Sequence, residues 1–177
     1  MRAGRISRAV GYPVAVAACV LGLAAVPGTA AAHGSQQGRG CVTLEGLHEV
    51  TQLTIHDGGE PGPGAGDLVK AHNELFNARG HLIGTSDGTI GVYAHPVTGE
   101  LWQWVMATDK LPGGKVVWAG HYKLGPAVAG EVTTLPATGV SGKYKGKTGE
   151  RWFRLVSRPS ENSTELESGV SLCRGRR

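Results

Sequence analysis

The feature that most constrains this chain is a repeated alternation of short apolar runs with breaks rich in glycine and proline. Glycine supplies 29 of the 177 residues and proline supplies 9. No apolar pattern with a helical period continues for three turns without a Gly or Pro, so we expect almost no helix. Runs with the two-residue period of a strand recur instead. The sequence therefore predicts an all-β domain.

Seven or eight strands are expected, joined by tight turns. The clearest break is Leu111-Pro112-Gly113-Gly114, which is typical of a hairpin turn. Two architectures contain this many hairpin-connected strands, a two-sheet sandwich and a closed up-and-down barrel. The expected strands cover residues 47–56, 67–77, 81–94, 100–108, 115–123, 131–135 and 150–157, and residues 170–173 are also strand-like.

The first 32 residues have the pattern of a secretory signal peptide. Three arginines in residues 1–8 precede an apolar stretch over residues 9–26, and alanines at 30–32 fit a signal peptidase site. An uncleaved membrane anchor is the alternative, because the apolar stretch is about 18 residues long. We expect cleavage before His33 and export from a bacterial cell, with no membrane association of the mature protein.

Removal of this segment lowers the net charge of the chain almost to zero. The full chain has 18 basic and 14 acidic side chains, a net charge of +4. Three of the basic residues and none of the acidic ones lie in the first 32 residues, which leaves 15 basic against 14 acidic. A nearly neutral mature chain gives no electrostatic basis for nucleic acid binding. No nucleic acid partner is expected.

Two cysteines, Cys41 and Cys173, remain in the exported chain. An even number of cysteines in an exported domain predicts a disulfide. This bridge would place the two ends of the domain side by side. Two distant cysteines lack the spacing of a zinc site, and the seven histidines include no His-Glu-x-x-His motif. We therefore expect no metal site.

The hairpin over residues 100–122 favours the barrel over the sandwich. Trp102 and Trp104 share one face of its first strand, and Val105 occupies the other face. Apolar residues therefore lie on both faces. A barrel filled on the inside and packed against a second subunit on the outside needs this pattern, whereas a sandwich with one wet face does not.

Four segments, taken in order, resemble the superfamily of allene oxide cyclases and dirigent proteins. Residues 66–76, GDLVKAHNELF, are similar to the family's Gly-Asp-Leu-Val strand that continues to Asn-x-Leu-aromatic. Residues 138–149, TGVSGKYKGKTG, resemble a glycine-rich segment common to both groups. Between them, Ile83-Gly84 with Gly88 and the strand at 114–120 are similar to the family's intervening strands. The resemblance covers roughly residues 50–156.

The resemblance implies an eight-stranded antiparallel up-and-down barrel with an apolar central cavity. It also implies that subunits associate as dimers or trimers. Family members steer reactions by the shape of the cavity, so the resemblance implies no metal and no organic cofactor. The expected partner is a small apolar molecule.

The resemblance also selects candidate site residues. Asn73 matches an inward Asn of the family, which helps to hold an epoxide oxygen or an ordered water; the alternative is a core amide bonded to backbone. The family's acid falls near Thr54, so the expected carboxylate is absent there. His56 and Asp57 are the nearest replacements as catalytic acid or base. The residues expected to line the cavity are Thr54, Val69, Leu75, Trp102, Trp104 and Trp118.

These expectations define a domain plan and two classes of function. Residues 1–32 are the signal peptide, 33–46 an extension, 47–158 the barrel, and 159–177 a tail tied back by the disulfide. The first class is a secreted, cofactor-independent cyclase or stereo-guiding isomerase, although the plant reaction itself is not expected without the acid. The alternative is a non-catalytic extracellular binding or structural protein for an apolar ligand. Cavity volume separates them, since a lumen filled by Trp and Leu leaves no room for a substrate.

Overall fold

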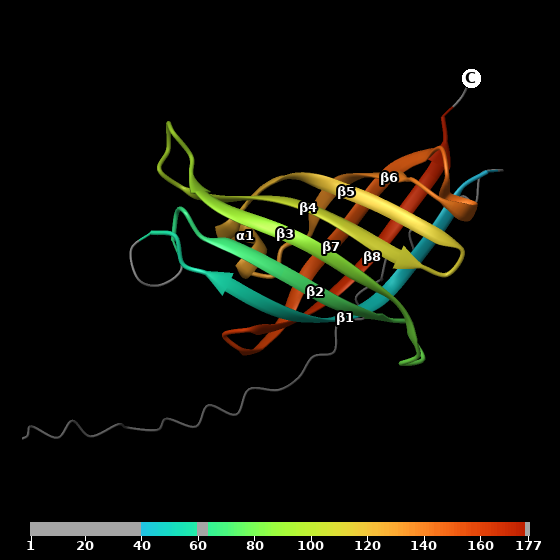
Figure 1. The fold of residues 1–177 in the computed structure, drawn as a ribbon, viewed down its shortest axis with the longest axis horizontal. Coiled ribbons are helices and arrows are strands. Elements are labelled where there is room, and N and C mark those ends of the chain that lie inside the picture. Colours follow the sequence, from blue (N-terminus) through green and yellow to red (C-terminus); the bar gives the residue numbers. More distant parts are fainter. Residues whose placement is uncertain (1–39, 60–63, 176–177) are drawn as a thin grey trace, which may run out of the picture. The chain divides into compact units, whose positions relative to one another are not determined.

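A computed structural model describes residues 40–59 and 64–175 of the chain. These residues form a closed barrel of eight antiparallel strands that follow one another in chain order (Figure 1). The last strand pairs with the first and so closes the sheet. The predicted all-β up-and-down barrel is confirmed. The strands are β1 (Val42–His56), β2 (Leu68–Phe76), β3 (Leu82–Ala94), β4 (Leu101–Leu111), β5 (Gly114–Lys123), β6 (Thr133–Gly139), β7 (Lys147–Ser160) and β8 (Ser163–Arg174).

Helix is confined to two short segments of the described residues, as predicted. The helix α1 (Leu124–Val128) connects β5 to β6, and a 3-10 turn (Gly142–Tyr144) connects β6 to β7. None of the helices in residues 40–59 and 64–175 is long and apolar enough to cross a membrane. The predicted Pro112-Gly113 hairpin joins β4 to β5, and Gly113 has a φ of +88°, a conformation that favours glycine.

Two strands extend beyond the predicted boundaries of the barrel. β1 begins at Val42, inside the expected extension. The sequence did not predict this start because the register shifts between Leu44 and Leu47, and the shift interrupts the alternation of apolar and polar residues. β8 occupies most of the expected tail, where serines and glutamates conceal the strand pattern. The predicted signal peptide, residues 1–32, lies outside the described residues.

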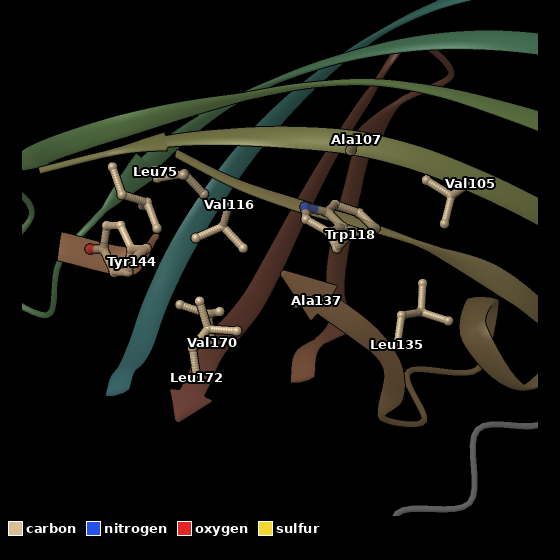
Figure 2. Packing of buried hydrophobic residues seen from close by; sticks show 11 residues of the cluster. Leu75, Val105, Ala107, Val116, Trp118, Leu135, Ala137, Tyr144, Val170 and Leu172 are labelled. Atoms are coloured by element: carbon tan, nitrogen blue, oxygen red, sulfur yellow. The ribbon is translucent and has the colours of Figure 1, made fainter. Parts of the chain in front are cut away.

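One end of the barrel is closed by apolar side chains. Tyr144, from the 3-10 turn, is fully buried and donates a hydrogen bond to the backbone oxygen of Pro112. It packs in a cluster with residues of β2, β4, β5 and β8, namely Leu75, Leu111, Val116, Val170 and Leu172. Figure 2 shows Tyr144 beside Leu75 and Val116, with Val105 and Leu135 farther along the lumen.

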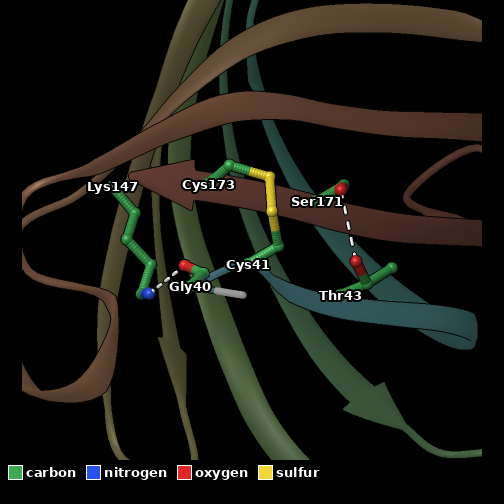
Figure 3. The surroundings of a disulfide bond; sticks show 6 residues. All are labelled: Gly40, Cys41, Thr43, Lys147, Ser171 and Cys173. Atoms are coloured by element: carbon green, nitrogen blue, oxygen red, sulfur yellow. Dashed lines mark hydrogen bonds between the residues drawn. A yellow bond between two sulfur atoms is a disulfide. The ribbon is translucent and has the colours of Figure 1, made fainter. Parts of the chain in front are cut away.

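The predicted disulfide between Cys41 and Cys173 lies at this closed end (Figure 3). It joins the residue before β1 to the penultimate residue of β8, next to the register pair of Val42 and Leu172. The hydroxyls of Thr43 and Ser171 lie 3.2 Å apart beside it, and Lys147 donates to the backbone oxygen of Gly40. The bridge therefore fastens the seam at which the barrel closes.

Candidate functional site

The barrel encloses a cavity of about 640 Å³. Space arises half-way along the lumen because three neighbouring strands present small residues there: Ala71 pairs with Gly88, and Gly88 pairs with Ala107. At the α1 end the lining includes the exposed side chains of Arg158 and Glu161. The cavity therefore opens to solvent at the end opposite the disulfide.

A cluster of buried charged side chains forms the base of this cavity. Arg151 on β7 donates from Nε to Oδ2 of Asp109 on β4 at 2.9 Å, and from Nη2 to Oε1 of Glu49 on β1. Asn73 Nδ2 donates to Glu49 Oε2 at 2.7 Å, and Trp118 Nε1 donates to Asp109 Oδ1 at 2.7 Å. Every carboxylate oxygen in the cluster thus has a donor, which a buried charge requires.

Arg151 holds the base of the cavity together. Its side chain is 1% exposed, and burial alone disfavours a guanidinium charge. The carboxylates of Glu49 and Asp109 outweigh this effect and raise the pKa of Arg151 above its ordinary value. Its Nη1 donates to the backbone oxygen of Trp152 at 2.8 Å. With all three nitrogens engaged, Arg151 positions the two acids.

The two polar atoms of the Asn73 side chain have different surroundings. Its Nδ2 is bonded to Glu49, whereas its Oδ1 has no hydrogen-bond partner within the described residues. The same holds for Oγ1 of Thr51, which is the register partner of Asn73 on β1. Buried polar atoms of this kind are usually satisfied by a water or a ligand. The base of the cavity therefore offers an acceptor and a hydroxyl to whatever occupies it.

Five of the residues singled out by the sequence lie in or beside the lumen. Asn73, Val69 and Trp118 line the cavity, and Asp57 lies at its open end. Leu75 also points inward, but it is completely buried in the apolar cluster that closes the barrel. The alternation of β2 that placed Val69, Asn73 and Leu75 on one face therefore agrees with the structure.

Four other residues lie on the outer face of the barrel, contrary to the prediction. Thr54 and His56 are exposed because their neighbours Leu53 and Ile55 face the lumen. Trp102 and Trp104 point outward because the residues that alternate with them on β4, Gln103 and Val105, line the cavity.

The two outward indoles have partners on the outside. Trp104 covers Gly91 of β3, where an added Cβ would lie 2.2 Å from the indole Nε1. The Trp102 ring lies 5.4 Å from the ring of His95, centroid to centroid. These contacts use the outer surface of the sheet and leave the lumen open.

Sequence reasoning missed the charged residues at the base. Position 54 itself holds a threonine, but Glu49 lies on the inward face of the same strand and contacts Asn73. Asp109 and Arg151 were also missed. Only Arg151 gives the signal that identified Asn73, a lone polar residue in an apolar stripe, because Thr51 and Gln103 are further polar residues on the inward faces of β1 and β4. In residues 40–59 and 64–175 the structure has no group of three or more His, Cys, Asp or Glu side chains arranged to hold a metal.

Comparison with known families agrees with this architecture. Residues 40–166 match the sequence profile of the family described as the allene oxide cyclase barrel-like domain. The chain belongs to that family. The resemblance seen in the four sequence segments is therefore confirmed.

Solved structures with the same fold include cyclases and dirigent proteins. The Diels–Alderase AbmU from Streptomyces koyangensis is 21% identical, with a TM-score of 0.66 over 76% of this chain and 64% of AbmU. The exo-specific intermolecular Diels–Alderase AbnU is 24% identical, with a TM-score of 0.64 over 75% of this chain and 96% of AbnU. A pterocarpan synthase dirigent protein is 10% identical, with a TM-score of 0.58 over 77% of this chain and 97% of that protein. The chain thus spans less than two thirds of AbmU, and at these identities the likeness concerns the fold.

Proposed function

We propose that this chain binds a small, mostly apolar molecule in its barrel cavity and steers the ring closure of that molecule. The observation that carries the proposal is the open lumen of about 640 Å³, which leaves room for a substrate. The presence of Diels–Alderases and a dirigent protein among the structures with this fold supports a cyclase or stereo-guiding isomerase.

The chemistry of ring closure suits such a site. In a [4 + 2] cycloaddition two carbon–carbon σ bonds form, two π bonds are consumed, and no electron or group is supplied from outside. The protein contributes by holding the chain in a folded conformer close to the transition state and by excluding water. Val69, Ile90 and Val105 supply an apolar wall, while Asn73 and Thr51 would orient a polar end of the substrate at the base.

The place of action that we propose is outside the cell. The signal-like first 32 residues and the disulfide between Cys41 and Cys173 both support export. We further propose that the mature chain self-associates as a dimer or trimer through its outer face. A second candidate function, a secreted carrier that binds an apolar ligand without transforming it, is supported by the same cavity.

Binding can be tested with N-phenyl-1-naphthylamine, a neutral apolar dye that fluoresces in apolar surroundings. We expect saturable binding of one dye per chain. Ala71→Phe places a ring in the middle of the cavity and should abolish that binding, because Ala71 is one of the small residues that create the space. Glu74→Phe places the same ring on the outer face of β2 and serves as the control. Unaltered dye binding by Ala71→Phe would contradict the proposal.

Catalysis can be separated from carriage with an achiral triene such as deca-1,7,9-trien-3-one. This compound closes to a racemic bicyclic ketone without a catalyst. A protein that steers the closure should accelerate it and give an enantiomeric excess, and Ala71→Phe should return the product to a racemate. Dye binding together with a racemic product formed at the uncatalysed rate would favour the carrier.

A further inference from the structure

Two polar side chains on the wall of the cavity have no role in the cluster at its base. Gln103 on β4 and Tyr122 on β5 are cross-strand register partners, and both line the cavity. Side chains paired in this way have Cβ atoms about 4.5–5.5 Å apart, so both can reach one ligand atom. They lie toward the open end, because Tyr122 is two residues before the start of α1.

Neither side chain has a hydrogen-bond partner in the part of the chain that the structure describes. The surroundings of the pair are apolar: Val92 is the register partner of Gln103 on β3, and the ring of Phe153 meets the ring of Tyr122 edge to face at 5.5 Å. The contact with Phe153 fixes the ring of Tyr122 but leaves its hydroxyl unbonded. A phenol and an amide are thus presented, unbonded, on an otherwise apolar wall.

The pair offers donors to its ligand. Burial raises the pKa of the Tyr122 hydroxyl, so the phenol remains protonated and able to donate at neutral pH. Gln103 adds an amide with two N–H donors. Arg151 is committed to Glu49 and Asp109, and Arg158 at the open end donates to the backbone oxygen of Glu161. The chemistry of the pair therefore matches a neutral acceptor better than an anion.

We infer that Gln103 and Tyr122 form a subsite for a neutral carbonyl oxygen of the ligand. This inference depends on the proposed function and narrows it to ligands that carry a ketone, ester or lactone on an apolar skeleton. If the carbonyl is conjugated to the reacting double bond, the two hydrogen bonds withdraw electron density from that bond. The subsite would then stabilise the transition state as well as orient the substrate.

The test uses two probes of the same shape, 2-acetylnaphthalene and 2-isopropenylnaphthalene, which differ in having a carbonyl oxygen or a methylene group. Wild-type protein should bind the ketone more tightly. Tyr122→Phe and Gln103→Leu should each weaken ketone binding by about two- to twelvefold, the range for loss of one neutral hydrogen bond, and leave binding of the hydrocarbon unchanged. Tyr93→Phe is the matched control, since the Tyr93 hydroxyl is bonded to His121 Nδ1 at 3.0 Å, away from the cavity lining.

A spectroscopic readout separates a bound carbonyl from a change in cavity shape. The infrared stretch of the 13C-labelled ketone should lie at lower frequency in wild-type protein than in an apolar solvent, and it should rise in both variants but not in Tyr93→Phe. A stretch equal to that in apolar solvent, or equal weakening of both probes by the variants, would overturn the subsite while leaving the cavity function intact. Failure of both probes to bind wild-type protein would overturn the subsite and the proposed function together.

Discussion

The amide of Asn73 shows how one side chain can serve both stability and ligand binding. A carboxylate accepts hydrogen bonds, so the bond to Glu49 fixes the amide nitrogen on that side and turns the oxygen toward the cavity. The sequence left two interpretations of Asn73, a polar contact for a ligand and a satisfied core amide. The first applies to its oxygen and the second to its nitrogen. The core partner is the Glu49 side chain and not backbone.

This arrangement predicts opposite effects of two substitutions in one register pair. Asn73→Leu removes the donor to Glu49 Oε2 and leaves a buried carboxylate oxygen unsatisfied, so unfolding free energy should fall by about 1–3 kcal/mol. Thr51→Val removes a hydroxyl that has no partner within the described residues, so stability should be unchanged or slightly higher. Denaturant unfolding of both variants measures the difference. Equal stability of Asn73→Leu and wild type would show that the bond to Glu49 contributes nothing.

At the scale of strands, the sequence predicted the inward face correctly where one face of the strand is apolar and the other is polar. Residues 69–75 of β2 alternate clearly, and Pro112-Gly113 marks the turn between β4 and β5, so both were placed correctly. β4 could not be oriented, because Trp104 and Val105 are both apolar and a shift of one residue exchanges the faces. Because of this ambiguity, Trp102 and Trp104 were wrongly predicted to line the cavity. The structure resolves it, because Val105 and Ala107 line the cavity and the tryptophans that alternate with them therefore face outward.

The charged base of the cavity could not be assembled from the sequence for a related reason. Glu49 and Arg151 are 102 residues apart and meet only because β1, β7 and β8 are neighbours in the closed barrel. On β1, an inward Glu49 next to an outward Val50 reverses the usual pattern. Local alternation therefore gave no indication that Glu49 faces the lumen.

The disulfide acts on two elements, β1 and β8, whose pairing closes the sheet. Replacing Cys41 and Cys173 together by Ser should lower the unfolding free energy by about 2–5 kcal/mol, because the bridge restricts the unfolded chain over almost the whole domain. Thr43→Ala is the control at the same seam, since it removes only the contact with Ser171 and should change stability by less than about 0.5 kcal/mol. Equal denaturation midpoints for the double Ser variant and wild type would contradict this account.

At the scale of the whole molecule, the barrel has an inner surface suited to a ligand and an outer surface with apolar side chains on β4 and β5. Met106 is 60% exposed on this outer face, and the half-buried Trp104 lies two residues away on the same face. A closed barrel has no free sheet edge through which to assemble, so association would have to use such a face. The outward tryptophans, which do not line the cavity, thereby support the expected contact between subunits.

We therefore expect the mature protein to be a dimer or trimer whose contact includes the outer face of β4. Met106→Lys introduces a charge that would have to be buried in the contact, so the variant should dissociate to monomers at micromolar concentrations where wild type remains associated. Val97→Lys adds the same charge at a residue that is 86% exposed between β3 and β4, and it should leave the assembly unchanged. Light scattering coupled to gel filtration measures the mass of each. A monomeric wild-type protein would refute association, whereas an oligomer unaffected by Met106→Lys would place the contact on another face; in both cases the cavity, which lies inside a single barrel, would keep its proposed role.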